Sequence, residues 1–410
     1  MHTKMKVTMP QDAALILNRL NQGGHEAYIV GGCVRDSILG RNPQDWDITT
    51  SALPEETKAL FDRTFDTGIQ HGTITIVLHK ENYEVTTYRI DGDYADCRHP
   101  DAVSFTKNLK EDLLRRDFTM NAIAYHPAEG FRDPFQGQED IDARCIRGVG
   151  NPTLRFQEDA LRMLRCVRFA AQLGFTVEEG TWAALCANTS LIQKISVERI
   201  REELKKLWLS PFVEKMPLLW ESGLLAQIAP LLSARLIANS PAVLKQLSAC
   251  PKEESLCWCI VLQEYTPAEA QKLLKYLKFD NATLKRICLL LEYLPQDAPT
   301  DAYALRKLAG TIGEEAARQL LLLQSILRPA SAHAQSLALL ETILADGDCL
   351  TLKTLALSGK DLMALGAPHG KELGAVLAEL LDMVLHTPEN NTKEYLTEQA
   401  LAILKAKALL

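Results

Sequence analysis

Two carboxylates separated by one residue are the clearest candidates for chemistry in this 410-residue chain. Asp45 and Asp47 flank Trp46, and an extended backbone would place both side chains on one face, roughly 7 Å apart. Like charges at that spacing repel each other unless a cation lies between them. Mg²⁺, which binds carboxylates, waters and substrate phosphates, is the predicted occupant. We therefore expect Asp45 and Asp47 to be catalytic metal ligands, although an exposed strand edge could show the same pattern.

A glycine pair precedes these carboxylates. Gly31 and Gly32 lie between an apolar strand predicted over 27–30 and a helix predicted over 34–39. Glycine lets the backbone approach a ligand closely, and the free N–H groups at a helix start favour an anion. Arg35, one turn into the helix, could donate two hydrogen bonds to a phosphate. We expect Gly32 and Arg35 to bind nucleotide phosphates; the alternative is a structural turn with a surface arginine.

The carboxylates and the glycine turn together have the layout that nucleotidyl transfer needs. One metal ion would activate the attacking hydroxyl, and a second would neutralise the pyrophosphate leaving group. Protein side chains would mainly position the reactants and stabilise charge.

A row of charged residues farther along the chain could contact a base. On a helix predicted over 155–169, Asp159, Arg162 and Arg165 share one broad face, and Arg168 lies at its edge. An acid beside an arginine can present an acceptor and donors to the edge of a base. The alternative is a solvated face. A second, apolar row should pack on the core: Leu161, Leu164 and Val167.

These segments resemble, in order, the motifs of the DNA polymerase β-like nucleotidyltransferases. They are most similar to the class II tRNA nucleotidyltransferase and poly(A) polymerase family, and within it to the bacterial CCA-adding branch. The resemblance is dense over 27–175 and rests on the segments 28–40, 45–49, 84–89, 115–121 and 158–162.

The resemblance implies roles for single residues. It places Arg116 against the incoming nucleotide. It assigns base reading to Asp159 and Arg162, and nucleotide contacts to Arg165 and Arg168. Glu84 keeps two interpretations, a third carboxylate near the metals or a structural acid. The segment 115–117 also keeps two, which are compatible with each other: a nucleotide contact through Arg116 and a helix start capped by Asp117.

The resemblance also implies the reaction: untemplated addition of CCA to the 3′ end of tRNA from CTP and ATP, with Mg²⁺, in the cytoplasm and without an obligate protein partner. The polar segment 91–101, with Asp96 and Arg98, favours CCA or A addition over CC addition alone. Poly(A) polymerases of the family often have Pro where Ala160 stands and a basic C-terminal extension, which is not seen here. An A-adding enzyme, a poly(A) polymerase and a non-catalytic RNA-binding protein remain alternatives.

The elements that must position these residues fall into four predicted parts. An α/β head over 1–145 carries the chemistry, and an all-α remainder forms a neck over 146–210, a body over 211–328 and a tail over 329–410. Within the head, strands are predicted over 27–30, 46–49, 73–78 and 83–89, and a second helix over 55–61. In the tail, Lys360 and Lys371 stand at expected helix starts, where they could hold RNA phosphates or be ordinary cap neighbours.

Bulk composition constrains the class of protein. The chain is 47% hydrophobic and 24% charged, as in ordinary globular proteins, and no apolar run reaches the roughly 18 residues of a membrane helix. Its ten cysteines lack metal-site spacing and indicate free thiols in a reducing compartment. The net charge of −7 argues weakly against a nucleic-acid partner, so a basic face would have to be made by folding.

Overall fold

The computed structural model describes residues 7–92, 103–328 and 331–407 and contains two compact units, 1–240 and 241–410. The division falls in helix α12 (Pro230–Ala249), where Asn239 leaves the helical conformation at φ −118° and ψ 16°. Pro241 follows and lacks the N–H group that would continue the hydrogen-bond ladder. The predicted boundaries at 145, 210 and 328 lie inside these units and stay predictions.

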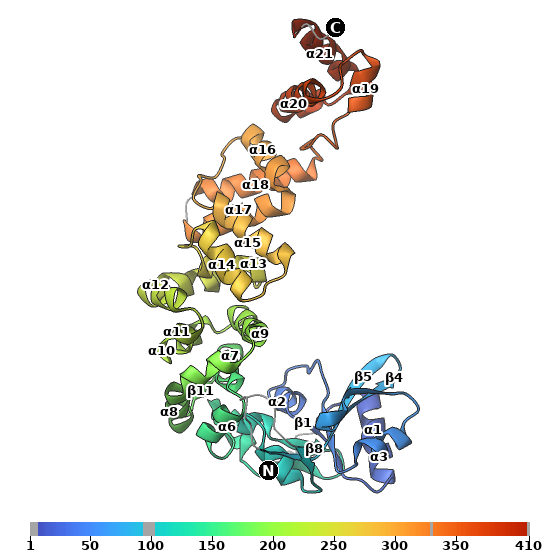
Figure 1. Ribbon diagram of the computed structural model, residues 1–410, viewed down its shortest axis with the longest axis vertical. Helices are drawn as coiled ribbons and strands as arrows, with labels where there is room; N and C mark the ends of the chain where they lie inside the picture. The colour runs from blue at the N-terminus through green and yellow to red at the C-terminus, as the bar shows by residue number, and fades with distance from the viewer. Residues whose placement is uncertain (1–6, 93–102, 329–330, 408–410) are drawn as a thin grey trace. The chain divides into compact units, whose positions relative to one another are not determined.

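The first unit begins with a mixed seven-stranded sheet, in the order β3-β4-β5-β2-β1-β8-β9 (Figure 1). Only β2 and β5 pair in parallel; the other neighbours are antiparallel. The strands are β1 (Ala27–Val30), β2 (Ile48–Thr50), β3 (Thr64–Gly68), β4 (Thr73–Leu78), β5 (Glu81–Thr87), β8 (Ala124–His126) and β9 (Gly130–Arg132). Two small ladders pair β6 (Arg89–Asp91) with β7 (Val103–Phe105) and β10 (Cys145–Ile146) with β11 (Thr176–Val177).

Helices of the head pack on this sheet through apolar faces. Tyr28 and Val30 of β1 share a buried cluster with Leu113 of α4. The helices are α1 (Gln11–Gln22), α2 (Gly32–Ile38), α3 (Pro54–Leu60), α4 (Leu109–Leu114), α5 (Gly137–Asp142) and the 3₁₀ turns η1 (Ile69–His71) and η2 (Thr119–Asn121). The α/β head is therefore confirmed.

Two predicted strands differ from the structure. The strand predicted over 46–49 begins only at Ile48, so Asp45 and Asp47 precede it instead of alternating within it. The strand predicted over 83–89 is β5, which starts at Glu81 and ends at Thr87, followed by the separate β6. The strands predicted over 27–30 and 73–78 match β1 and β4.

The rest of the first unit is helical, apart from β11, but its first long helix is broken. The helix predicted over 155–169 is two helices, α6 (Pro152–Glu158) and α7 (Leu161–Leu173). Asp159 between them has extended backbone angles, φ −137° and ψ 102°. Asp159 therefore does not share a helical face with Arg162 and Arg165, and that expectation was wrong. The apolar row of Leu161, Leu164 and Val167 is buried as predicted.

The remaining helices of this unit are α8 (Glu179–Asn188), η3 (Thr189–Lys194), α9 (Val197–Trp208), η4 (Val213–Lys215), α10 (Leu218–Glu221), α11 (Leu224–Ile228) and the first part of α12. α7 and α9 pack side by side. The helix that carries the predicted base-contact arginines therefore packs against α9.

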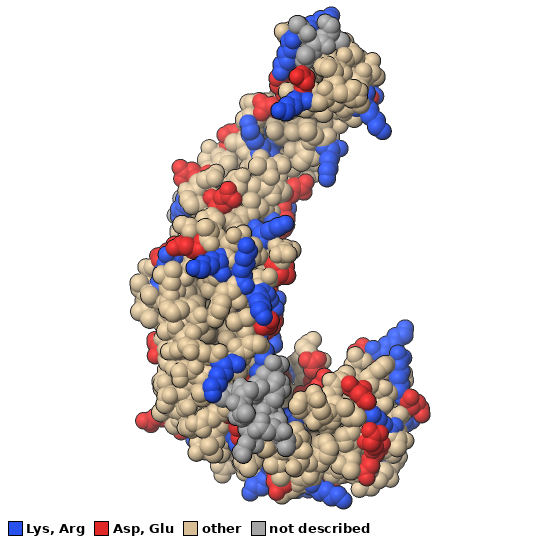
Figure 2. All heavy atoms as spheres, in the orientation of Figure 1, with Lys and Arg blue, Asp and Glu red and all other residues tan. Residues whose placement is uncertain are grey.

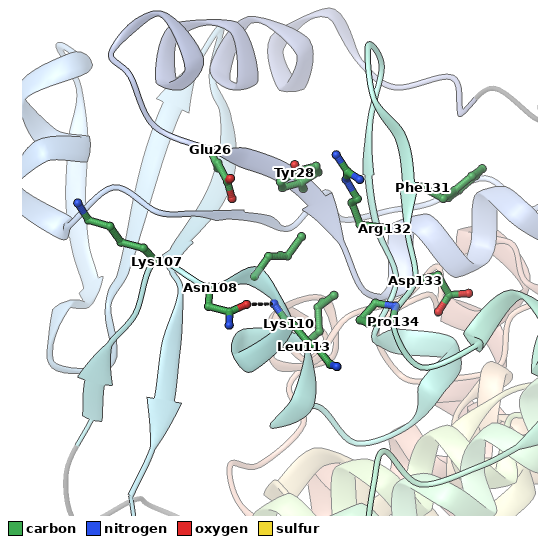
Figure 3. Close-up of a pocket in the computed structure, with 11 residues that line it drawn as sticks. Glu26, Tyr28, Lys107, Asn108, Lys110, Leu113, Phe131, Arg132, Asp133 and Pro134 are labelled. Atoms are coloured by element: carbon green, nitrogen blue, oxygen red, sulfur yellow. Dashed lines mark hydrogen bonds between the residues drawn. The ribbon is translucent and has the colours of Figure 1, made fainter.

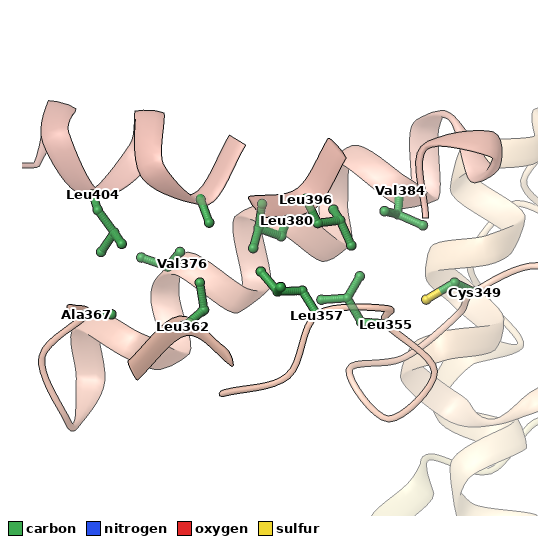
Figure 4. Close-up of a cluster of buried hydrophobic side chains, with 11 residues drawn as sticks. Cys349, Leu355, Leu357, Leu362, Ala367, Val376, Leu380, Val384, Leu396 and Leu404 are labelled. Carbon is green, nitrogen blue, oxygen red and sulfur yellow. The ribbon is translucent and has the colours of Figure 1, made fainter. Parts of the chain in front are cut away.

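The second unit contains helices and no strand among its described residues. It comprises the end of α12, then α13 (Glu254–Val261), α14 (Pro267–Tyr276), α15 (Asn281–Tyr293), α16 (Ala302–Ile312), α17 (Glu314–Leu327), α18 (Ser331–Ala345), α19 (Gly359–Ala364), α20 (Lys371–His386), η5 (Pro388–Asn390) and α21 (Lys393–Ala406). One buried cluster joins α19, α20 and α21 through Leu362, Val376, Leu380 and Leu396 (Figure 4). The predicted helical remainder is confirmed, except for the short strand β11 within 146–210.

Two bulk expectations can be compared with the described residues. None of their helices combines the length and the apolar character needed to span a bilayer. The nine cysteines among them are all free thiols.

Candidate active site

The two predicted metal ligands lie in the segment that leads into β2. Asp45 and Asp47 are exposed, as a site open to substrate requires. β2 pairs with β5 so that Ile48 lies opposite Val85, which sets Asp47 level with Glu84 on the neighbouring strand. The pKa of Glu84 is raised by partial desolvation and then by the charges of Asp47 and Asp45. The negative charges of Asp45 and Asp47 are therefore close enough to Glu84 to disfavour its ionisation.

The donor set fits a hard divalent cation. The pKa of Asp47 is raised by desolvation, against the opposing charge of Arg116, and raised further by Asp45. A cation between the two aspartates would relieve this repulsion. The described residues hold no group of three or more His, Cys, Asp or Glu side chains placed to bind a metal. Both interpretations of Glu84, a third carboxylate near the metals and a structural acid, stay predictions. Such an ion would take its other ligands from water and substrate phosphates.

The glycine turn brings the backbone against these charges. Gly31 has φ +82°, a conformation that favours glycine. A Cβ atom at Gly31 would lie 3.2 Å from Nη1 of Arg116 and 3.9 Å from Oδ2 of Asp47. The turn, Asp47 and Arg116 therefore converge on one small space. Gly32 opens α2 directly beside it, where its predicted phosphate contact stays a prediction.

Arg116 follows the C-terminal end of helix α4, which positions it beside the Gly31 turn and Asp47. Asn108 begins the helix by accepting a hydrogen bond from the backbone N–H of Lys110, at the edge of a pocket of about 690 Å³ (Figure 3). None of the predicted site residues lines that pocket. Arg115 and Arg116 follow the other end of the helix. The Nε atom of Arg116 is buried and has no hydrogen-bond partner among the described residues.

A buried carboxylate that sequence reasoning missed orients this end of α4. Asp112 is fully buried and accepts hydrogen bonds from Nε and Nη2 of Arg115 at 3.0 and 2.7 Å and from Nη2 of Arg116 at 3.5 Å. The hydroxyl of Thr49 on β2 also donates to it, at 3.1 Å. Although burial acts to raise it, the pKa of Asp112 lies below its usual value because of Arg115 and Arg116. Asp112 thus connects Arg115 and Arg116 to β2, the strand that follows Asp47.

Arg35 is engaged within the fold. Its guanidinium donates to Oδ1 of Asn121 at 2.7 Å and to Oδ1 of Asp36 at 3.0 Å. It also lies over the ring of Phe169, 4.9 Å from the centroid. Arg35 is 6% exposed, so its donors serve internal contacts in this conformation, and its predicted phosphate contact stays a prediction.

Asp117 links the head to helix α7. Its Oδ2 accepts from Nε and Nη2 of Arg165 at 2.8 and 2.6 Å, and its Oδ1 accepts from Nδ2 of Asn121 at 3.0 Å. Burial opposes ionisation, but the charge of Arg165 and the bond from Asn121 hold the pKa of Asp117 well below its usual range. Phe118, not Asp117, is the N-cap of η2, so the cap interpretation was wrong.

The predicted base-contact residues are all paired. Asp159 forms a salt bridge with Arg199 of α9, and Arg162 donates to Oε2 of Glu158 at 2.8 Å and to the carbonyl of Arg115 at 2.7 Å. The buried Arg168 forms a salt bridge with the buried Glu203, 2.5 Å between Nε and Oε2. Arg165 keeps the most open side chain of the three predicted arginines, at 34% exposed, compared with 11% for Arg162 and 7% for Arg168.

Three side chains of this site were not predicted: Asp112, Arg199 and Glu203. Arg199 and Glu203 lie one turn apart on α9, and their partners are about forty residues away in sequence. No local pattern in the sequence indicates such pairings. Asp96 and Arg98, on which the expectation for the segment 91–101 rested, lie outside the described residues.

Comparison with known proteins assigns the family. Residues 27–147 match a model of the poly A polymerase head domain, and residues 174–236 match a model described as a probable RNA and SrmB-binding site of polymerase A. Residues 250–400 match a model of domain 2 of tRNA nucleotidyltransferases. A CCA-adding enzyme of Geobacillus kaustophilus is 39% identical over 391 residues, which cover 94% of this chain and 95% of the relative. The chain belongs to the CCA-adding enzyme family.

Other members agree over nearly the whole chain. A CCA-adding enzyme of Lactobacillus gasseri is 36% identical over 96% of this chain and 98% of its own length. The crystal structure of a Bacillus stearothermophilus CCA-adding enzyme in complex with CTP superposes with a TM-score of 0.83 at 34% identity, covering 98% of this chain and 99% of that one. The chain is therefore an enzyme, a tRNA nucleotidyltransferase, and the family expected from the motifs is confirmed.

Proposed function

We propose that this chain builds and repairs the 3′-terminal CCA of tRNA, using CTP and ATP and releasing pyrophosphate. The observation that carries the proposal is the convergence of Asp47, Arg116 and the Gly31 turn on one space, beside helices that carry paired acids and arginines. Membership in the CCA-adding enzyme family supports the same reaction. The 3′-hydroxyl of tRNA attacks the α-phosphorus of the nucleotide, and the bond to the pyrophosphate breaks.

Each part of the site has a role in this reaction. Asp45 and Asp47 would hold Mg²⁺, which would lower the pKa of the attacking hydroxyl and neutralise charge on the phosphates. Arg116, oriented by Asp112, holds its guanidinium beside the Gly31 turn, where its positive charge would stabilise the growing negative charge of the leaving group. Gly32 offers its backbone N–H group to the same phosphates.

Asp159 and Arg162 select the base. Cytosine and adenine carry an amino group, a hydrogen-bond donor, at the ring position where uracil and guanine carry a carbonyl oxygen, an acceptor. An ionised carboxylate accepts only, so Asp159 would favour these two bases over uracil and guanine. Arg165, the most exposed of the three arginines, contributes a positive charge to the same region.

Basic side chains of the second unit support contact with an RNA backbone. Figure 2 shows Lys and Arg side chains gathered over the α13–α15 part of one face. Exposed lysines on or beside α14 and α15 are Lys272, Lys275, Lys278 and Lys285. Such a surface reconciles the net charge of −7 with a nucleic-acid partner, because the charge is uneven.

Lys360 and Lys371 are exposed in the first turns of α19 and α20. Ser358 and Asp361 form an ordinary capping box at α19, so a structural interpretation holds there as well. Their contact with tRNA phosphates is part of the proposal. A tRNA substrate also places the enzyme in the cytoplasm.

The first experiment supplies Mg²⁺ and a tRNA that ends at its discriminator base. CTP alone, ATP alone and both together are offered, and product lengths are measured on a gel. Two additions with CTP and three with both nucleotides are expected. Extension only of tRNA already ending in CC would identify an A-adding enzyme, and long A tails would identify a poly(A) polymerase.

A substitution tests the metal site. We expect Asp47→Ala to abolish incorporation while tRNA binding, measured by gel shift, is retained. Asp62→Ala, an exposed acid of the same head, is the matched control and should be fully active. Unchanged incorporation by Asp47→Ala would remove Asp47 from the catalytic centre, and no extension by the unaltered protein would favour a non-catalytic RNA-binding protein.

A further inference from the structure

The carboxylate proposed to read the base is held by a residue of another helix. Nη2 of Arg199 donates to Oδ2 of Asp159 at 2.8 Å, and Nη1 of Arg199 lies 3.4 Å from Oδ1. One terminal nitrogen of the guanidinium thus meets each oxygen of the carboxylate. This two-point geometry restricts rotation of the carboxylate far more than a single contact would.

The backbone around Asp159 cannot hold the side chain in place alone. Asp159 lies in the break between α6 and α7, and one local bond restrains it, from the N–H of Leu161 to Oδ1 at 3.0 Å. With that bond and the Arg199 pair, Oδ1 has two donors and Oδ2 has one. A carboxylate oxygen can accept two hydrogen bonds, so Oδ2 keeps one acceptor position free. The side chain of Asp159 is 18% exposed, so the carboxylate is not sealed within the fold.

We propose that Arg199 is a positioning residue for base selection. It fixes the carboxylate of Asp159 so that the free acceptor position of Oδ2 meets the amino group of cytosine or adenine. This inference rests on the proposed role of Asp159. Uracil and guanine present a carbonyl oxygen in place of the amino group, and an acceptor held rigidly opposite a second acceptor rejects it. A carboxylate released from Arg199 can turn away and admit the wrong base.

The other charged groups near Asp159 do not replace Arg199. Arg165 is close enough to sense the charge of Asp159, but two of its nitrogens donate to Asp117. Glu203, one turn after Arg199 on α9, binds Arg168. Among the described residues, Arg199 is the one arginine that forms a salt bridge with Asp159.

The test compares four variants of the full-length enzyme: Arg199→Ala, Arg199→Lys, Asp159→Ala and Arg201→Ala. Arg201 is the matched control, because it lies on the same helix and pairs with its neighbour Glu202. For each variant, kcat/KM is measured separately for CTP, ATP, UTP and GTP on tRNA, together with KM for tRNA. The readout is the ratio of CTP to UTP and of ATP to GTP, because general damage to the fold lowers all four values together.

We expect Arg199→Ala to reduce both ratios on the order of tenfold, within the range that one good base contact supplies. Arg199→Lys keeps the charge but cannot contact both oxygens, so its ratios should fall between those of Ala and the unaltered enzyme. Arg201→Ala should leave the ratios unchanged. If Arg199→Ala does not fold, the Lys variant decides: ratios equal to the unaltered enzyme overturn the proposal.

The outcomes separate this inference from the proposed function. If Asp159→Ala reduces the ratios and Arg199→Ala does not, Arg199 has no positioning role while base reading by Asp159 stands. If Asp159→Ala itself leaves the ratios intact, base reading by Asp159 fails, and the role of Arg199 fails with it. If the ratios fall equally in Arg199→Ala and Arg201→Ala, the effect belongs to the helix and not to the pair.

Discussion

The salt bridge between Arg168 and Glu203 gives the sharpest test of what the α7–α9 pair contributes. Both side chains are buried, with 7% and 6% of their surface exposed. Removing one partner of a buried pair leaves an uncompensated charge and typically destabilises by about 3–5 kcal/mol. In Glu203→Ala, Arg168 would keep its bond to Gln172 at 2.6 Å and its position 3.8 Å from the Phe169 ring centroid. We therefore expect the lower end, about 3 kcal/mol.

Native-state hydrogen exchange on the full-length chain measures this effect. A loss of about 3 kcal/mol corresponds to roughly 150-fold faster exchange of the slowest amides in α7 and α9. Glu341→Ala is the control, because Glu341 pairs with Arg318 at the surface, where both side chains are more than a third exposed. An exposed pair of that kind contributes at most about 1 kcal/mol.

The double variant Arg168→Met with Glu203→Leu completes the test. Apolar replacements leave no unpaired charge, so most of the lost protection should return. An effect of Glu203→Ala no larger than that of Glu341→Ala would refute the reasoning. The double variant also tests the predicted nucleotide contact of Arg168: an unchanged KM for CTP would assign Arg168 to the fold, whereas a large increase would support the contact.

Three further substitutions test the fold, two in the head and one in α20 of the second unit. Asp117→Asn should lower the free energy of unfolding at pH 7, because the pKa of Asp117 in the folded state lies below its usual value. The ionised carboxylate contributes its full stabilisation above the ordinary aspartate pKa of about 4. That stabilisation is lost as the pH falls through the pKa of the folded state. The gap between Asn variant and unaltered protein, measured by urea unfolding, should therefore narrow below about pH 4, and a constant gap down to pH 3 would contradict this. Gly137→Ala would place a Cβ atom 2.2 Å from the carbonyl oxygen of Thr119 and should destabilise by about 1–3 kcal/mol or more in thermal unfolding. Gly374→Ala, in α20, should stabilise the protein by about 0.5–1 kcal/mol, because the new Cβ would meet no atom within 4 Å beyond its own helix backbone and chain neighbours. Equal changes in stability at Gly137 and Gly374 would show that steric contact with Thr119 has no effect and that backbone entropy alone sets the change.

Much of the head could be predicted because its signals are local. The four apolar residues of β1 and the alternating β4 match the predicted strands, and glycines mark the turn into α2. The residues around Asp47 and Arg116 converge because β1 and β2 pair antiparallel, which places the end of β1 beside the start of β2.

The break at Asp159 could not be predicted from local preference. The residues around it are ordinary helix formers, and the side chain of Asp159 interrupts the helix by accepting from the N–H of Leu161. That conformation is reinforced by Arg199, forty positions later. Asp112 escaped notice for a related reason: its bonds to Arg115 and Arg116 are local, but its link to β2 depends on Thr49, which lies 63 positions away in sequence.

The bonds between α4 and the neck have an uneven tolerance to mutation. Arg155 donates to the carbonyl of Leu114, and Arg162 donates to the carbonyl of Arg115. Every amino acid supplies a carbonyl, so the accepting side survives a change of side chain at either position. The donating side depends on two guanidinium groups that other side chains do not reproduce. A change of side chain at 114 therefore keeps the accepting carbonyl, whereas a change at 155 or 162 removes the donating guanidinium. A random library should lose function at 155 and 162 and tolerate changes at 114.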